Sequence, residues 1–263
     1  MNPVVTSIAR FPVKGLSPEP LTSVHLRAGQ GIDGDRAFAL ALPDTDFDEQ
    51  NPTPLPKTKF LMLARQEALA RLRTRYDADS GVLSVVDGDA TLEANTRSVD
   101  GVASINAFFE QFVPDDMRGR EPRFVRGIGH RFTDVGVHSS FLMNTISILN
   151  LASLRDFEQK LGKKVDARRF RMNVLIEGLH PWEEMDWLEG EKQVSIGRVK
   201  LRAVRPTRRC PATQVNPDTT LRDIDVPKEL LRLYDHVLLG IYLTVETDGV
   251  IAVGDGIARP VES

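Results

Sequence analysis

The chain has 263 residues, of which 41% are hydrophobic, so it can form one large or two ordinary domains around a buried core. Its net charge of −3 gives no reason to expect nucleic-acid binding, which usually needs a clearly basic face. Because the N-terminus lacks the pattern of a signal peptide and no apolar run approaches the roughly 20 residues that cross a bilayer, we expect a cytoplasmic protein with no membrane partner.

The first hundred residues predict mainly strands and turns. Val4–Val13 is rich in β-branched and apolar residues, and Arg36–Leu42 is apolar enough to be buried on both faces of a sheet. Asp87 and Gly88 lie between two further apolar segments and are typical of a tight hairpin turn, where positive φ angles are required. The segment Ala64–Tyr76 is the helix that we expect in this region.

The next segments predict one loop and one helix. Pro43–Pro56 carries four prolines and several acids with little apolar periodicity, which indicates an exposed loop that can form a rim over a site. A short helix should begin near Asp100, because apolar residues recur there at helical spacing. These residues are Ile105, Phe108, Phe109 and Phe112.

The C-terminal half combines two helices with several short strands. Asn150 can cap a helix that runs to Leu161, where Gly162 supplies a stop, and a last helix should span Asp225–Tyr234. The expected strands are Val174–Ile176, Val194–Ile196, Val199–Val204, Gly240–Glu246 and Val250–Val253. Many short strands with interspersed helices favour a β-rich barrel over a doubly wound parallel sheet. We therefore predict a mainly β chain of the α+β class, with a soft boundary between residues 95 and 130.

Cys210 is the only cysteine in the chain. A single thiol cannot form an intrachain disulfide, a zinc cage or an iron–sulfur cluster, so we expect no iron–sulfur cluster here. Arg208 and Arg209 precede it directly, with Arg205 close behind, and guanidinium groups stabilise a thiolate. Such a thiolate can act as one ligand to a metal cofactor that brings its other ligands, or as a nucleophile; an inert buried thiol is the alternative.

Basic residues recur at predicted strand ends, next to glycine, proline or asparagine. The set consists of Lys14 before Gly15, Arg36, Arg168, Arg169, Arg171 before Asn173, and Arg208 with Arg209. Arginine forks bind phosphate in a bidentate manner, so the set predicts a site for an anion such as a phosphorylated cofactor. Each arginine alone would be interpreted as a solvated surface charge.

Other motifs are weaker. Gly29, Gly31 and Gly34 have the spacing of a dinucleotide fingerprint, but a strand rather than a helix should follow, so we reject that interpretation. His180–Glu184 offers a histidine and two carboxylates but no second histidine at zinc spacing, and we interpret its acids as solvated and its tryptophan as a packing residue. A cysteine–histidine hydrolase stays open, since its partners meet in space rather than in sequence.

Three blocks of sequence resemble the MOSC family, named for the C-terminal domain of molybdenum cofactor sulfurase. Phe11–Leu16 followed by Gly31–Leu40 resembles the opening of the N-terminal β-barrel domain found in two-part members. The first half of the MOSC domain is similar to Arg169–Gly178 with Trp182–Trp187. A third block resembles the cysteine segment and the end of that domain: Arg209–Thr219, Gly240–Tyr242 and Val253–Asp255.

The resemblance implies a smaller N-terminal β-barrel domain at residues 1–115 and a MOSC β-barrel at residues 116–263. It also implies a molybdenum–pyranopterin cofactor with Cys210 as thiolate ligand to the metal and catalytic residue, and it raises pyridoxal phosphate binding as a further expectation. In the related amidoxime-reducing enzymes, several matching positions contact the cofactor or lie near it. The cofactor contacts that we expect are Lys14, Gly15, Arg36, Asn150, Ser153, Arg171, Asn173, Arg208 and Arg209.

The likeness has three departures. Arg208 stands where those reductases commonly carry a small hydroxyl residue, Met172 where proline is usual, and Asn216 where aspartate is common. The leading hypothesis is a reductase of N-hydroxylated or N-oxide-like small molecules, with electrons from a separate ferredoxin, flavodoxin or flavin reductase. The alternatives are a carrier that binds the cofactor without turnover and a sulfurtransferase that uses a Cys210 persulfide.

Overall fold

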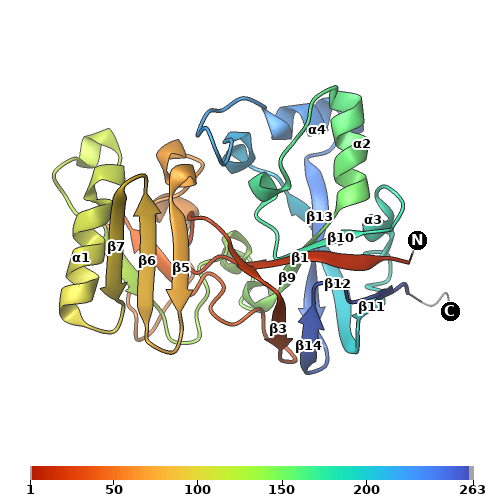
Figure 1. Ribbon diagram of the computed structural model, residues 1–263, viewed down its shortest axis with the longest axis horizontal. Helices are drawn as coiled ribbons and strands as arrows, with labels where there is room; N and C mark the ends of the chain where they lie inside the picture. Colours follow the sequence, from red (N-terminus) through yellow and green to blue (C-terminus); the bar gives the residue numbers. More distant parts are fainter. Residues whose placement is uncertain (1, 261–263) are drawn as a thin grey trace.

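The computed structural model describes residues 2–260 and has two lobes (Figure 1). The larger lobe contains an eight-stranded sheet in the order β15-β11-β12-β13-β9-β10-β1-β2, in which only the β9–β10 pair is parallel. Its strands are β1 (Val4–Arg10), β2 (Glu19–Leu21), β9 (Ile146–Asn150), β10 (Val174–Glu177), β11 (Gln193–Ile196), β12 (Val199–Arg208), β13 (Leu238–Val245) and β15 (Ile257–Ala258).

The large sheet curls until its two ends meet. The N–H of Val5 donates to the carbonyl of Asp255 at 2.9 Å, and the N–H of Ile257 donates to the carbonyl of Pro3 at 2.8 Å. An antiparallel bridge between Val4 and Gly256 lies between them. The enclosed core is aliphatic, with Trp187 as its large aromatic member. This closure gives the larger lobe its barrel-like form.

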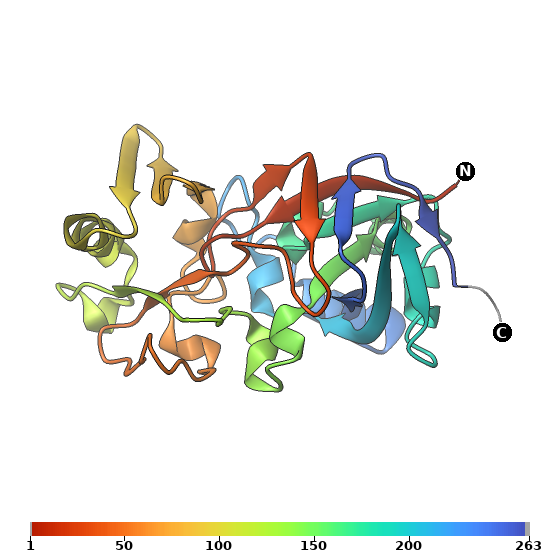
Figure 2. The same cartoon turned by 90° about the horizontal axis from the view of Figure 1, so that it is seen from below.

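A strand pair and three helices complete the larger lobe. The strands β3 (Ser23–Leu26) and β14 (Gly249–Ala252) pair antiparallel and lie side by side in Figure 2. The helices are α2 (Leu151–Leu161), α3 (Glu183–Asp186) and α4 (Val226–Tyr234). The Asn150 side chain accepts a hydrogen bond from the Ala152 N–H at the start of α2, and Gly162 ends that helix with a φ of 73°, as their positions in the sequence predicted.

The smaller lobe contains two small sheets and one helix. Its elements are β4 (Phe38–Ala41), β5 (Arg73–Asp77), β6 (Val82–Asp87), β7 (Ala90–Asn95), β8 (Arg123–Arg126) and α1 (Val99–Phe109). Strand β4 pairs with β8, and β5, β6 and β7 form a meander whose second turn contains Gly88 at a φ of 59°. The predicted hairpin is therefore confirmed. Ile105 and Phe109 of α1 are buried against these strands.

Short 3₁₀ turns connect many of these elements. They are η1 (Lys57–Lys59), η2 (Glu67–Arg71), η3 (Glu110–Phe112), η4 (Asp115–Met117), η5 (Asp134–Val137), η6 (Leu142–Asn144), η7 (Ala167–Phe170) and η8 (Pro211–Gln214). The helix expected over Ala64–Tyr76 is wrong, because η2 and β5 divide that segment. Within residues 2–260, no helix combines the length and the apolar character that a membrane span would need.

The mainly β character with interspersed helices is confirmed. Strand pairing also shows which parts of the chain form each lobe. Strands β1 and β2 hydrogen-bond into the large sheet beside β10, whereas β8 pairs with β4 in the smaller lobe. The domain boundary at residues 115/116 concerns family domains and stays a prediction. In space, the first strands of the chain and its C-terminal half build one sheet.

Candidate functional site

Cys210 lies where a long strand of the larger lobe ends. It follows β12 by two residues and is the N-cap of η8, which begins with Pro211. The backbone N–H and the hydroxyl of Thr213 both donate to the carbonyl of Cys210, at 3.0 and 2.8 Å, and hold this turn in place. The free thiol is half-buried, so its sulfur is neither sealed in an apolar core nor fully solvated.

Charged side chains from distant parts of the chain form a connected group beside this thiol, in which Lys57 and Arg171 are its direct neighbours. We name this group the cysteine cluster; its members are Lys14, Arg36, Lys57, Asp134, Arg171 and Cys210. Lys57 belongs to η1, directly after the proline-rich segment, and its Nζ lies 3.6 Å from a carboxylate oxygen of Asp134. Burial alone would lower the pKa of Lys57, but the Cys210 sulfur and the Asp134 carboxylate together raise it above its ordinary value.

Lys14 and Asp134 form the second ion pair of the cluster. The Lys14 side chain is buried, donates to the carbonyl of Phe132 at 3.1 Å and pairs with Asp134. Burial lowers the pKa of Lys14 despite the attraction of Asp134. Burial would raise the pKa of Asp134, but Lys14 and Lys57 hold it below its ordinary range. Asp134 is therefore an anion between two lysines.

Arg36 and Arg171 both stack on one aromatic ring. Their guanidinium carbons lie 4.4 and 4.5 Å from the centre of the Phe11 ring. Both arginines have left-handed backbones, with φ of 50° and 54°, which non-glycine residues rarely adopt. Arg36 donates to the Arg171 carbonyl at 2.9 Å and pairs with Asp35 at 2.6 Å. Two strained turns thus bring two cations together.

Arg171 is the least compensated cation of the cluster. Its Nη1 donates to the backbone carbonyl of Leu16 at 2.5 Å, and it forms no salt bridge with any residue from 2 to 260. Burial and repulsion from Arg36 lower the pKa of its guanidinium to about 9, so it remains charged at neutral pH. A half-buried cation that has, among residues 2–260, one backbone carbonyl as acceptor retains spare donors for an anion.

The other predicted contacts beside Cys210 have different surroundings. Arg209 turns its guanidinium to the backbone and donates to the carbonyls of Phe170 and Leu239, each at 2.9 Å. Burial lowers the pKa of Arg209 to about 10. Arg208 is exposed at the last position of β12. Arg209 therefore holds the cysteine turn against its neighbours, while Arg208 faces solvent.

Gly15 and Asn173 shape the backbone around the cluster. Gly15 has a φ of 84°, and a Cβ there would lie 3.2 Å from the carbonyl oxygen of Leu61, so a side chain would be strained and crowded. The buried Asn173 accepts from the N–H and the hydroxyl of Ser147, at 3.1 and 2.9 Å, and donates to the carbonyl of Ala9 at 3.2 Å. Its amide thus joins β1, β9 and β10 beneath the site.

Asn150 and Ser153 belong to a separate group. We name it the glutamate cluster; its members are Asn150, Ser153 and Glu184, all fully buried. The Asn150 amide and the Ser153 hydroxyl each donate to the Glu184 carboxyl group at 2.8 Å, and the N–H of Trp182 donates to Ser153. Burial raises the pKa of Glu184. The expectation that this acid is solvated is wrong, whereas the cofactor role of Asn150 and Ser153 stays a prediction.

The sequence brought Lys14, Arg36, Arg171 and Cys210 to notice, and the structure gathers these four. It also adds Lys57 and Asp134, which had no signal of their own in the sequence. The proline-rich segment just before Lys57 was expected to form the rim of a site, and this was the one available hint. Residues 2–260 contain no group of three or more histidine, cysteine, aspartate or glutamate side chains that could hold a metal ion.

Comparison with known proteins identifies the C-terminal part of the chain. Residues 134–258 match the MOSC domain. The chain is 33% identical over 129 residues to mitochondrial amidoxime reducing component 2 of Bos taurus, a match that covers 44% of this chain and 37% of the relative. It is 37% identical over 120 residues to mitochondrial amidoxime-reducing component 1 of Homo sapiens, covering 41% of this chain and 34% of the relative. The chain therefore matches little more than a third of these relatives' length.

Two solved structures are also similar. YiiM from Geobacillus stearothermophilus aligns with a TM-score of 0.35 at 22% identity and covers 44% of this chain and 54% of its own. The YUAD protein from Bacillus subtilis aligns with a TM-score of 0.44 at 13% identity and covers 98% of this chain and 94% of its own. The sequence matches thus show a MOSC domain at residues 134–258, and the chain is homologous over 120–129 residues to the mitochondrial amidoxime-reducing components.

Proposed function

We propose that this protein is a molybdenum-cofactor-dependent reductase of N-hydroxylated or N-oxide-like small molecules, with Cys210 as the protein ligand to the metal. The observation that carries the proposal is the half-buried Cys210 thiol within a cluster that contains four cations. The MOSC domain and its relatives, which are named for amidoxime reduction, support it.

The residues present fit such a cofactor. Thiolate sulfur is a soft ligand suited to a transition metal, and arginine and lysine side chains suit phosphate oxygens. Four cations of the cysteine cluster, Lys14, Arg36, Lys57 and Arg171, face two carboxylates, those of Asp35 and Asp134. The cluster therefore has an excess of positive charge that an anionic cofactor would neutralise.

Each residue has a distinct task in this scheme. When bound, the cofactor supplies the redox chemistry that takes up an oxygen atom from the substrate. Cys210 supplies sulfur, and the Lys57 ammonium group lies beside that sulfur. Arg171 and Arg36 bind and orient the phosphate, while Asp134 keeps Lys14 and Lys57 in place between the two lobes.

The proposal is tested by measuring molybdenum content and activity on one preparation. The chain is expressed in a host that makes the cofactor, and the purified protein is analysed for molybdenum and then reduced chemically. We expect bound molybdenum and conversion of an aromatic amidoxime to the amidine. Protein without molybdenum would contradict the proposal.

Two other results would favour the alternatives. Bound molybdenum without reduction would favour a carrier, and an added sulfur on Cys210 in mass spectrometry would favour sulfur transfer. A separate electron-donor protein of the ferredoxin, flavodoxin or flavin reductase type is part of the proposal. Pyridoxal phosphate binding and a cytoplasmic location stay predictions.

A further inference from the structure

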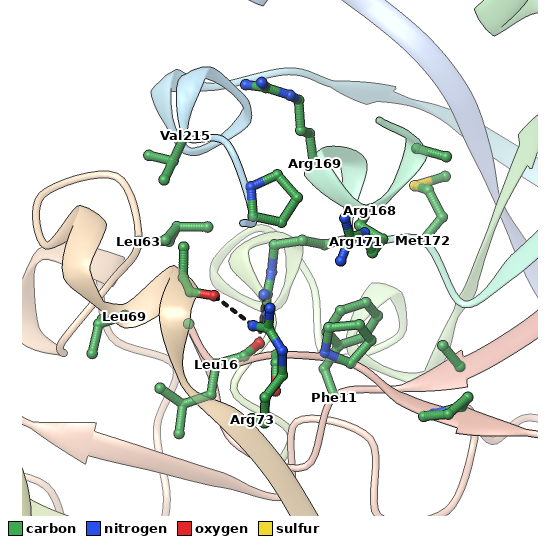
Figure 3. Close-up of a pocket in the computed structure, with 18 of the residues that line it drawn as sticks. Phe11, Leu16, Leu63, Leu69, Arg73, Arg168, Arg169, Arg171, Met172 and Val215 are labelled. Carbon is green, nitrogen blue, oxygen red and sulfur yellow. Dashed lines mark hydrogen bonds between the residues drawn. The ribbon is translucent and has the colours of Figure 1, made fainter. Parts of the chain in front are cut away.

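A cavity of about 330 Å³ lies between the two lobes (Figure 3). Its wall includes η2 and β5 of the smaller lobe, and β1, η7 and the residues Val215 and Pro217 after η8 from the larger lobe. Cys210, Lys14, Arg36, Lys57 and Asp134 do not line it. The cavity is therefore distinct from the thiol, although it reaches the edge of the same cluster at Arg171. Its volume lies at the lower end of the range typical of small-molecule sites, about 300–1,000 Å³.

The wall is mainly apolar. Its apolar side chains include Phe11, Leu16, Leu63, Leu69, Met172 and Val215, and Figure 3 shows them around the space. Such a surface gains free energy when an apolar body displaces water from it. A ligand without an aromatic or branched aliphatic part would not gain free energy from contact with this apolar wall.

The charged groups of the wall all have the same sign. They are Arg73, Arg168, Arg169 and Arg171, and no aspartate or glutamate lines the cavity. Arg168 is already paired with Asp166 and Asp218, each at 2.5 Å. The cavity thus presents a surplus of donors and no carboxylate to repel an anion.

Arg171 has donors to spare, whereas Arg169 does not offer one to the cavity. Arg171 has a backbone carbonyl as its acceptor and no salt bridge within residues 2–260. Arg169 is buried and paired with Asp223, but its Nε has no hydrogen-bond partner among the described residues. That Nε is enclosed by protein, and Figure 3 shows the Arg169 guanidinium pointing away from the apolar wall, so Arg171 is the donor that a ligand in the cavity can reach.

We propose that this cavity is a second ligand site, which binds a small organic carboxylate with an aromatic or branched aliphatic body. The carboxylate accepts hydrogen bonds from Arg171, and the apolar body packs between Leu63 and Leu69 on one side and Met172 on the other. The cavity shares Arg171 with the proposed cofactor site, but none of its lining residues supplies the thiol, and binding of a carboxylate here does not require reductase activity.

The test uses 2-naphthoate as the probe and the neutral 2-naphthamide as its matched control, each titrated calorimetrically into the full chain. We expect naphthoate to bind at least tenfold more tightly than naphthamide, and Arg171→Gln to remove that preference. Ala70→Phe, which fills the cavity without removing a charge, should weaken both probes at least tenfold. This second variant keeps the test decisive if Arg171→Gln does not fold.

Lys57→Gln separates the cavity from the thiol site, because Lys57 lies beside Cys210 and does not line the cavity. We expect this variant to bind naphthoate as the unmodified chain does. Equal affinity for the two probes, no naphthoate binding, or a loss in Lys57→Gln as large as in Arg171→Gln would overturn the proposal. Molybdenum content measured on the same samples reports separately on the reductase function.

Discussion

The cysteine cluster and the glutamate cluster are both built from polar side chains within one β framework, but they use their hydrogen-bonding groups differently. In the glutamate cluster the Asn150 amide and the Ser153 hydroxyl both donate to Glu184, and Ser153 also accepts from a backbone N–H. In the cysteine cluster, Arg171 has only one backbone carbonyl as acceptor, and the cations outnumber the carboxylates. The hydrogen-bonding groups of the glutamate cluster are paired with one another, whereas the cysteine cluster has an excess of positive charge.

This difference separates support from function. A closed polar network stabilises the fold because every buried group has a partner, and it has nothing left to offer a ligand. A cluster with surplus donors lowers the stability of the ligand-free protein, and the binding of an anion raises that stability again. The contrast favours the cysteine cluster as the cofactor site, and it makes the cofactor role predicted for Asn150 and Ser153 the first point to test.

The largest expected effect is on the thiol. We expect Cys210→Ser to lower reductase activity by at least about 100-fold. Mutation of residues that merely hydrogen-bond to a metal ligand already costs up to about 100-fold, so loss of the ligand itself should cost at least as much. The thermal unfolding midpoint should stay the same, because the thiol is half-buried and forms no disulfide. Activity is measured per mole of folded protein. Unchanged turnover in this variant would exclude Cys210 from the chemistry.

The glutamate cluster should respond in stability instead. Glu184→Ala leaves the buried Asn150 amide and Ser153 hydroxyl without their acceptor, which should cost about 2–3 kcal/mol of unfolding free energy. The matched control is Glu183→Ala, whose partner Arg259 is exposed, with an expected cost below about 1 kcal/mol. Urea denaturation measures both. If Glu184→Ala instead loses molybdenum at unchanged stability, the glutamate cluster serves the cofactor and the contrast is wrong.

The pH dependence of stability sharpens the same comparison. Because the folded-state pKa of Glu184 is raised above its unfolded value, the folded chain holds this proton while the unfolded chain releases it. Stability attributable to Glu184 is therefore fully present below the unfolded pKa of about 4.3 and declines as the pH rises through the folded pKa. Glu184→Gln, which cannot ionise, should gain stability relative to the parent between pH 5 and pH 8. A constant difference across that range would contradict the raised pKa.

Local signals in the sequence predicted much of the fold. The Asp87–Gly88 turn and the Asn150 cap were correct because each depends on the backbone preferences of one or two residues. The helix over Ala64–Tyr76 was wrong because the second half of that segment alternates between exposed and buried residues, the period of a strand. Arg75 is exposed and Tyr76 is buried in β5. A strand period limited to five residues was missed within a longer segment rich in alanine, leucine and arginine.

Site residues could be predicted from the sequence only where the residue type and its immediate neighbours indicated a chemical role. A lone cysteine beside arginines is such a signal, and so is an arginine next to asparagine or glycine. Lys57 and Asp134 are ordinary charged residues in loops, and only the packing of the two lobes brings them together beside Cys210. Glu184 was missed for the opposite reason, because nothing in Glu183–Glu184 tells which of the two carboxylates is buried.

The smallest expected effect concerns Lys57, which acts through Cys210 as a positioning residue. Its ammonium group lies beside the Cys210 sulfur and pairs with Asp134 at 3.6 Å. Lys57→Gln should lower activity about threefold to tenfold, in line with the loss of one partly exposed ion pair worth about 1 kcal/mol. Lys59→Gln, an exposed lysine of the same turn, is the matched control and should leave activity unchanged.

A second measurement distinguishes this role from a merely structural one. In cofactor-free protein at pH 7, Lys57→Gln should slow the alkylation of Cys210 by iodoacetamide, because the thiolate is the reacting form and its neighbouring cation is gone. Lys59→Gln should react at the parent rate. If both variants alkylate equally fast but Lys57→Gln still loses activity, Lys57 acts on the cofactor or the substrate rather than on the sulfur, and the surplus charge of the cysteine cluster serves the bound anion alone.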